Sequence, residues 1–196
     1  MMVKICGITN REDALAAIRG GASAIGINFY PKSPRYLAPE AAQELIENLD
    51  SKVMKVGVFV NQTAGAILAV AKAVGLDAVQ LHGEGCEAPE GMPVWRAVTV
   101  LPGFQVADLD AVAADACLLD APAGAHFGGT GRSFDWSLAR GANRPVILAG
   151  GLDDTNVRTA IEAARPWGVD ACSRLESAPG RKDHRKMAKF LEAARS

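Results

Sequence analysis

The sequence predicts a (β/α)8 barrel, a fold in which eight parallel strands close into a ring surrounded by helices. Apolar strand-like runs alternate with helical segments along the whole chain, and eight such repeats can be counted. The runs lack clean in–out alternation, as expected of strands that are covered on both faces. The 196 residues suit one barrel domain, residues 1–196. A doubly wound open sheet is the alternative, but it needs only about five or six strands.

The strand-like runs are short, apolar and rich in β-branched residues, and glycine, proline or polar residues bound them. We expect strands at 3–9 (ending in a turn), 23–27, 52–60, 77–81, 93–98, 116–119, 145–149 and 168–172. Helical spacing of apolar residues predicts helices over 10–19, 39–49, 64–74, 104–112, 134–140, 153–164 and 184–194, and segment 84–91 has room for no more than one helical turn. Thr9 or Asn10 can cap the first helix, Asp153 or Asp154 can cap the helix that runs through Ala164, and Gly75 ends the third helix.

Composition excludes several classes of protein. The net charge of -1 gives no basic field for nucleic acid or an anionic membrane, and no apolar run is long enough to span a bilayer. The four cysteines lack CxxC spacing, which argues against a zinc site and a disulfide framework. Free thiols and an N-terminus without a signal peptide predict a cytoplasmic protein.

The polar residues of these apolar runs gather at one end of the barrel. Carboxyl ends of all barrel strands face the same mouth, where the chemistry of such folds takes place. Lys4 and Cys6 share one face of the first strand. Each residue also has a plain structural interpretation, such as a core cysteine or a turn-forming aspartate. The residues expected at the mouth are Cys6, Asn28, Arg35, Asn61, Gln80, His82, Asp120, Gly150, Gly151, Ser173 and Arg174, with Arg96 inside its strand.

Two of these positions indicate a ligand. Gly150-Gly151 follows the seventh strand and precedes a helix, where barrels bind phosphate through backbone N–H groups. Arg35 lies on a loop with two prolines, and its planar guanidinium suits a carboxylate or a phosphate. His82 has no second ligand at metal spacing, so no metal is expected. A phosphorylated small molecule is the predicted partner.

The collected motifs resemble phosphoribosylanthranilate isomerase along almost the whole chain. The matching stretches are KICGIT (4–9), FYPKSPRY (29–36), VGVFVN (56–61), QLHG (80–83), LLD (118–120), GGTG (128–131) with FDW (134–136), AGGL (149–152) and GVD (168–170), with ES (176–177) and PG (179–180). Their number and order make the resemblance specific. It implies a single barrel, no cofactor, and a monomer or homodimer.

The resemblance also implies chemistry and roles. The family performs an Amadori rearrangement of N-(5'-phosphoribosyl)anthranilate, and its pattern makes Cys6 the base and Asp120 the acid. Arg35 would hold the anthranilate carboxylate, and Gly150 and Gly151 the phosphate. We expect Lys4, Asn28, Gln80 and His82 to contact substrate. A free thiol has a pKa of about 8.5 and a free aspartate a pKa of about 3.9. The pKa of each group must therefore be shifted if it is to act at neutral pH. Lys4, on the same face of the strand, is expected to lower the pKa of Cys6.

The chain departs from the family after the eighth strand, where the family usually has two serines and a glycine. The sequence here is Cys172-Ser173-Arg174. Arginine loses the glycine's freedom at positive φ but adds a cation that can pair with phosphate. We therefore expect Ser173 and Arg174 to bind phosphate, with Arg174 acting through its charge.

Three other functions can be weighed. A histidine-pathway aminoaldose isomerase usually pairs aspartates after strands one and five, where this chain offers Cys6 and Arg96 or Val98. A barrel that binds phosphate without catalysis is possible, but both expected catalytic side chains are present. An oxidoreductase is disfavoured because no GxGxxG follows the first strand.

Overall fold

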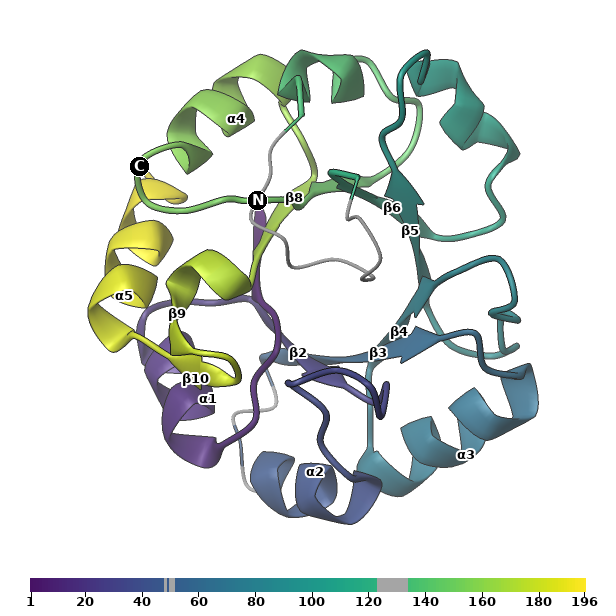
Figure 1. Cartoon of the computed structure of the whole chain (residues 1–196), viewed down its shortest axis with the longest axis vertical. Coiled ribbons are helices and arrows are strands. Elements are labelled where there is room, and N and C mark those ends of the chain that lie inside the picture. Colours follow the sequence, from purple (N-terminus) through teal and green to yellow (C-terminus); the bar gives the residue numbers. More distant parts are fainter. Residues whose placement is uncertain (48, 50–51, 123–133) are drawn as a thin grey trace.

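A computed structural model describes residues 1–47, 49, 52–122 and 134–196. Eight parallel strands form a closed barrel in chain order, and Figure 1 shows the helices outside this ring. Strand β1 pairs with β8 to close it, with Ile5 opposite Ala171. The predicted (β/α)8 barrel is confirmed, and the open sheet is wrong. The barrel strands are β1 Met2–Ile5, β2 Ala24–Asn28, β3 Met54–Val60, β4 Ala78–His82, β5 Val94–Thr99, β6 Ala116–Asp120, β7 Val146–Leu148 and β8 Gly168–Ala171.

In the described part of the chain, five α-helices cover the outside of the barrel: α1 Arg11–Arg19, α2 Pro39–Ile46, α3 Ala64–Val74, α4 Val157–Ala164 and α5 His184–Ala193. Of the two predicted caps for α1, Asn10 is the one used, because its side chain accepts from the Asp13 N–H at 2.9 Å. Gly75 ends α3 in the left-handed conformation, with φ 78°, as expected.

Several predicted helices are shorter than the sequence suggested. Segments 104–112 and 134–140 hold the 3-10 helices η1 Val106–Ala111 and η2 Trp136–Ala139. Helix α4 begins at Val157 because Asp153 instead forms a turn, accepting from the N–H and hydroxyl of Thr155. The predicted cap by Asp153 or Asp154 is therefore wrong.

The segment after β8 carries structure that the sequence did not indicate. A 3-10 helix, η3 Ser173–Leu175, leads into a two-stranded hairpin, β9 Glu176–Ala178 with β10 Arg181–Lys182. Asp13 of α1 accepts from the Lys182 N–H at 2.9 Å, which anchors this hairpin to the outside of the barrel. The hairpin thereby brings Glu176 and Lys182 close to the mouth.

The barrel has an outer and an inner core. The outer one fills the space between sheet and helices and includes Ile5, Ile25 and Phe59. The inner one is formed by small and branched side chains around Trp95, which is 3% exposed. Alternation along the strands places Lys4, Gln80 and Asp170 among these inward-facing residues, where burying polar groups requires partners.

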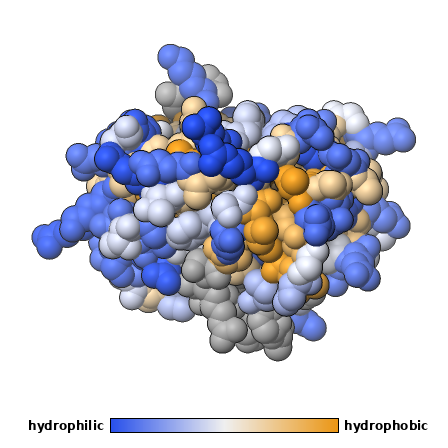
Figure 2. Space-filling view, turned by 90° about the horizontal axis from the view of Figure 1, so that it is seen from above, coloured by the Kyte–Doolittle hydropathy of each residue, from blue (hydrophilic) through white to orange (hydrophobic). Residues whose placement is uncertain are grey.

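Most of the face in Figure 2 is hydrophilic, with one orange apolar area beside the grey atoms. Across residues 1–47, 49, 52–122 and 134–196, none of the helices has the length and hydrophobicity needed to cross a membrane.

Candidate active site

Lys4 is at the centre of a polar network inside the barrel. Its ammonium donates to Gln80 Oε1 at 2.8 Å and to Asp170 Oδ1 at 2.9 Å, and the lysine has no exposed surface. Burial is the largest single influence and lowers the pKa of Lys4, but the charges and hydrogen bonds of Asp170 and Cys6 together raise it. Lys4 is therefore a fixed positive charge beneath the mouth.

The same network fixes the state of His82. Because Lys4 donates to the amide oxygen of Gln80, the amide nitrogen of Gln80 faces His82, and the two nitrogens lie 2.7 Å apart. The Gln80 nitrogen can only donate, so His82 Nε2 accepts and the proton is on Nδ1. Burial, and then the Lys4 charge, lower the pKa of His82 to about 4. His82 is a neutral donor at the mouth.

Cys6 follows β1 directly and meets a second thiol. Cys172 follows β8, the strand that pairs with β1, and each of the two thiols shifts the pKa of the other. This contact and burial raise the pKa of Cys6, while Lys4 acts in the opposite direction. The contact with Cys6, together with Lys182 and Arg35, lowers the pKa of Cys172 to about 7. The resting proton of the pair thus belongs to Cys6, and the expected influence of Lys4 is outweighed.

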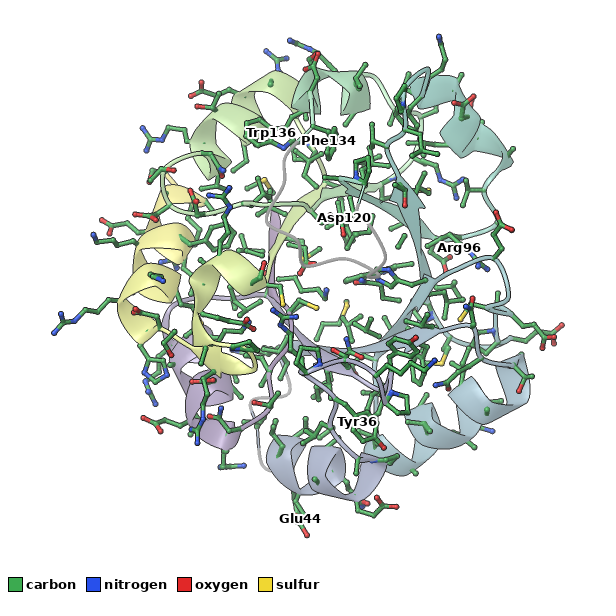
Figure 3. The ribbon with its side chains drawn as sticks, in the orientation of Figure 1. Tyr36, Glu44, Arg96, Asp120, Phe134 and Trp136 are labelled. Carbon is green, nitrogen blue, oxygen red and sulfur yellow. The ribbon has the colours of Figure 1, made fainter. Side chains whose placement is uncertain are left out.

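Asp120 ends β6 and projects inside the ring of strands, as Figure 3 shows. Burial, and then the charge of Asp170, raise the pKa of Asp120 to about 6. Gly150 makes room for this carboxyl, because a Cβ at Gly150 would lie 2.8 Å from Asp120 Oδ1. Asp120 can therefore hold a proton close to neutral pH.

A pocket at the mouth brings five of the predicted residues together. Gly150 and Gly151, both with positive φ, line it with Asp120 on one side and Cys172, Ser173 and Arg174 on the other. Arg174 is at the pocket rim, where its Nη1 donates to Asp153 Oδ2 at 2.8 Å. The glycine turn, a hydroxyl and a guanidinium are thus gathered around one opening.

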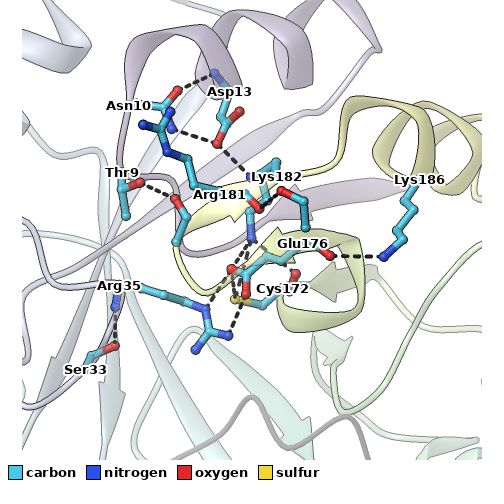
Figure 4. A network of polar contacts seen from close by, with 12 residues as sticks. Thr9, Asn10, Asp13, Ser33, Arg35, Cys172, Glu176, Arg181, Lys182 and Lys186 are labelled. Carbon is cyan, nitrogen blue, oxygen red and sulfur yellow. Dashed lines mark hydrogen bonds and ion pairs between the residues drawn. The ribbon is translucent and has the colours of Figure 1, made fainter.

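Arg35 belongs to a cluster of charged groups on the hairpin side of the mouth, shown in Figure 4. Its Nε and Nη2 donate to the two oxygens of Glu176 at 2.8 and 2.7 Å. Lys182 Nζ donates to the same carboxylate at 2.9 Å and lies 3.8 Å from Cys172 Sγ. Arg35 is therefore held rigidly, with its Nη1 edge outside the pair with Glu176.

Asn28 bonds within its own loop, and Arg96 lies apart from this arrangement. The Asn28 side chain accepts from the Tyr30 N–H at 2.8 Å and so shapes the loop that follows β2. Arg96 lies on the outer side of the ring in Figure 3 and donates to the Cys86 carbonyl at 3.0 Å. The mouth is therefore built without Arg96.

Four participants were missed as site residues: Asp170, Cys172, Glu176 and Lys182. A buried acid in an apolar strand was a usable signal for Asp170, since it demands a cation. No local pattern connected Glu176 and Lys182 with Arg35. In the part of the chain that the structure describes, no three His, Cys, Asp or Glu side chains are grouped so that they could hold a metal.

A closed barrel with a thiol, a protonatable carboxyl and a glycine-lined pocket at its mouth belongs to the class of barrel proteins that act on phosphorylated small molecules. Residues 3–193 match the family described as N-(5'phosphoribosyl)anthranilate (PRA) isomerase. The chain therefore belongs to the N-(5'-phosphoribosyl)anthranilate isomerase family.

Individual relatives agree over the full length. The N-(5'-phosphoribosyl)anthranilate isomerase of Solibacter usitatus is 50% identical, covering 100% of this chain and 98% of the relative. The crystal structure of phosphoribosyl anthranilate isomerase from Thermotoga maritima has a TM-score of 0.86 and 41% identity, covering 100% and 98% of the two chains. Another solved isomerase, in complex with reduced 1-(o-carboxyphenylamino)-1-deoxyribulose 5-phosphate, has a TM-score of 0.83 and 39% identity over 100% and 98%.

Proposed function

We propose that this protein converts N-(5'-phosphoribosyl)anthranilate into 1-(2-carboxyphenylamino)-1-deoxyribulose 5-phosphate, a step in tryptophan biosynthesis. The observation that carries the proposal is the pocket in which Asp120, with its raised pKa, faces the Gly150–Gly151 turn. The solved relative that holds a reduced form of this product supports the substrate. Aldose–ketose isomerisation within one molecule requires one acid and one base and no electron acceptor.

Asp120 is the proposed general acid. Protonation of the ribose ring oxygen breaks its bond to C1', and the anthranilate nitrogen supplies the electron pair that forms a Schiff base. A pKa of about 6 leaves a minor but useful protonated fraction of Asp120 at pH 7. Asp170 supports this role because its negative charge opposes ionisation of Asp120.

Cys6 is the proposed general base. It removes the C2' proton, and the electrons of that C–H bond form the enolamine, which tautomerises to the ketone. Only deprotonated Cys6 can act, and the buried Lys4 ammonium favours that thiolate. Because contact with Cys172 and burial keep the pKa of Cys6 raised, only a minor fraction of Cys6 is the reactive thiolate at neutral pH.

The remaining residues are proposed to bind substrate. Gly150, Gly151, Ser173 and Arg174 receive the phosphate, with backbone N–H groups, a hydroxyl and a positive charge. Arg35 presents its Nη1 edge to the anthranilate carboxylate while Glu176 holds its other edge. Further contacts are assigned to Lys4, Asn28, Gln80 and the Nδ1–H of His82. We further propose that the enzyme acts in the cytoplasm as a monomer or homodimer, without nucleic acid; its free thiols suit a reducing compartment.

Loss of substrate fluorescence tests this function directly. Phosphoribosylanthranilate is generated in situ, and its fluorescence is followed with the wild-type protein, Cys6→Ala and Asp120→Asn. The wild type should consume the substrate, and each variant should fold, by circular dichroism, yet lose turnover by about 10²–10⁴-fold. Wild-type protein that binds the product analogue without consuming substrate would be a phosphate-binding barrel with another role. A variant with near-normal turnover would lose its assigned role.

A further inference from the structure

Two thiols from opposite ends of the sequence meet at the barrel mouth. Cys6 follows β1 and Cys172 follows β8, and these strands are neighbours in the closed ring. Ile5 is opposite Ala171, and the Cys6 N–H donates to the Ala171 carbonyl at 2.9 Å. The register therefore places Cys6 directly across from Cys172, and each thiol shifts the pKa of the other.

The backbone geometry suits a bond between these sulfurs. Neighbouring strands lie about 4.8 Å apart, within the Cα separation of roughly 4.4–6.8 Å that disulfides span. Glycine keeps both sulfurs unobstructed. A Cβ at Gly7 would come within 2.9 Å of Cys172 Sγ, and one at Gly26 within 2.8 Å of Cys6 Sγ. The two sulfurs can therefore join with little movement of the chain.

The surroundings make Cys172 the more reactive sulfur. Lys182 Nζ lies 3.8 Å from Cys172 Sγ, and Arg35 also favours the thiolate, whereas Glu176 Oε1 at 3.9 Å opposes it (Figure 4). Cys172 is partly exposed and lines the pocket, while Cys86 and Cys117 are buried. Burial raises the pKa of Cys117, which disfavours its reactive thiolate. An oxidant entering the pocket should therefore meet Cys172 first.

We propose that Cys6 and Cys172 form a reversible disulfide when the protein meets a hydroperoxide. The Cys172 thiolate attacks the peroxide oxygen, the O–O bond breaks, and the leaving alkoxide or hydroxide takes up a proton. Cys6 then attacks the sulfenic sulfur of Cys172, the S–O bond breaks, and water leaves with the proton of Cys6. Two thiols are oxidised, and one hydroperoxide is reduced to an alcohol (or water) and water. A dithiol reductant reverses the bond.

The disulfide would remove Cys6 as a base, so turnover would stop until the bond is reduced. This consequence rests on the proposed function of Cys6, whereas formation of the bond does not. The two are therefore measured separately, the bond by peptide mapping and the consequence by turnover.

The experiment compares wild-type protein with Cys172→Ser after treatment with hydrogen peroxide. Serine is the residue that the family pattern places here, so the variant keeps the size and polarity of the site. Each sample is quenched with an alkylating reagent and digested without reductant, and each turnover is expressed relative to the same untreated protein. Wild type should yield one linked peptide joining Cys6 and Cys172 and regain most of its turnover with dithiothreitol. Cys172→Ser should form no such peptide and should lose less of its turnover to peroxide, because it lacks the thiolate that reacts first.

Three results decide the proposal. Absence of the linked peptide while Cys6 or Cys172 is oxidised to a sulfinic acid overturns it, as does linkage only to Cys86 or Cys117. A linked peptide with full turnover keeps the disulfide and instead contradicts the catalytic role of Cys6. Cys6→Ser is the second control, since it must abolish the linked peptide without depending on turnover.

Discussion

Lys4 and Asp170 form an ion pair of 2.9 Å inside the barrel, with side-chain exposures of only 0% and 8%. Removing one partner leaves an uncompensated buried charge, which is far more costly than removing both. Lys4→Met should therefore lower the free energy of unfolding by about 3–5 kcal/mol, measured by urea denaturation. The double variant Lys4→Met/Asp170→Asn should recover part of that loss. A double variant less stable than Lys4→Met would contradict the pairing argument.

The raised pKa of Asp120 predicts a pH-dependent stability. The folded protein holds this proton up to a pKa of about 6, against 3.8 for an ordinary aspartate. The folded state therefore binds more protons than the unfolded state between these values, so the free energy of unfolding falls as pH rises from about 4 to 6. Asp120→Asn removes this decline. The free energy of unfolding of Asp120→Asn, relative to that of the wild type, should therefore increase by roughly 2–3 kcal/mol between pH 4 and pH 7.

The control for this prediction is Asp135→Asn. Hydrogen bonds from the Ser137 hydroxyl and N–H lower the pKa of Asp135, so its carboxylate stabilises the folded state above the ordinary aspartate pKa and that contribution is lost as pH falls. Thermal denaturation as a function of pH should show opposite trends for the two variants. Parallel trends would mean that burial of Asp120 does not control its titration.

Arg35→Lys tests whether Arg35 binds the anthranilate carboxylate. Lysine keeps the charge but cannot hold Glu176 with two parallel bonds while offering a third donor to substrate. We expect KM to rise about tenfold or more, corresponding to the loss of one charge-assisted hydrogen bond, with a smaller change in kcat. Arg96→Lys is the matched control, because Arg96 lies outside the barrel and should change neither constant. Equal effects of the two substitutions would remove Arg35 from substrate binding.

The sequence was sufficient for the barrel and for the position of the mouth. Strand-like runs and glycine turns are local features, and parallel strands bring their ends together whatever their distance along the chain. That reasoning placed Asp120, Gly150, Gly151, Ser173 and Arg174 around one pocket, as the structure has them. The presence of helices could also be predicted from local sequence. Their lengths could not, because they depend on competing turns such as the one that Asp153 forms.

The partners of the site residues could not be predicted in the same way. Lys4 and Asp170 are 166 positions apart, and Arg35 and Glu176 are 141 apart. These contacts depend on which strands become neighbours and on the hairpin that returns to the mouth. The protonation states of Cys6 and Asp120 follow from such contacts, so pKa directions needed the three-dimensional structure.

Arg174 is where this chain departs from its family, and replacement by the family's glycine tests its role. Arg174 lines the pocket and is 45% exposed in its ion pair with Asp153, so its charge is partly screened by water. Arg174→Gly should weaken binding of inorganic phosphate about three- to tenfold, as expected for one charge-assisted contact near solvent. Inhibition of turnover by phosphate at several salt concentrations measures this, and the difference should shrink as salt rises.

The matched control for Arg174→Gly is Arg165→Gly. Arg165 is an exposed cation at the C-terminal end of α4, with φ 50°, where glycine fits the left-handed backbone without strain. In a (β/α)8 barrel that end of a helix lies opposite the mouth, so the variant loses the same charge without touching the pocket. Phosphate inhibition should be unchanged. If Arg174→Gly also leaves inhibition unchanged, phosphate is held by the Gly150–Gly151 turn and Ser173 without Arg174. If both substitutions weaken inhibition equally, the overall charge of the protein is responsible rather than a contact made by Arg174.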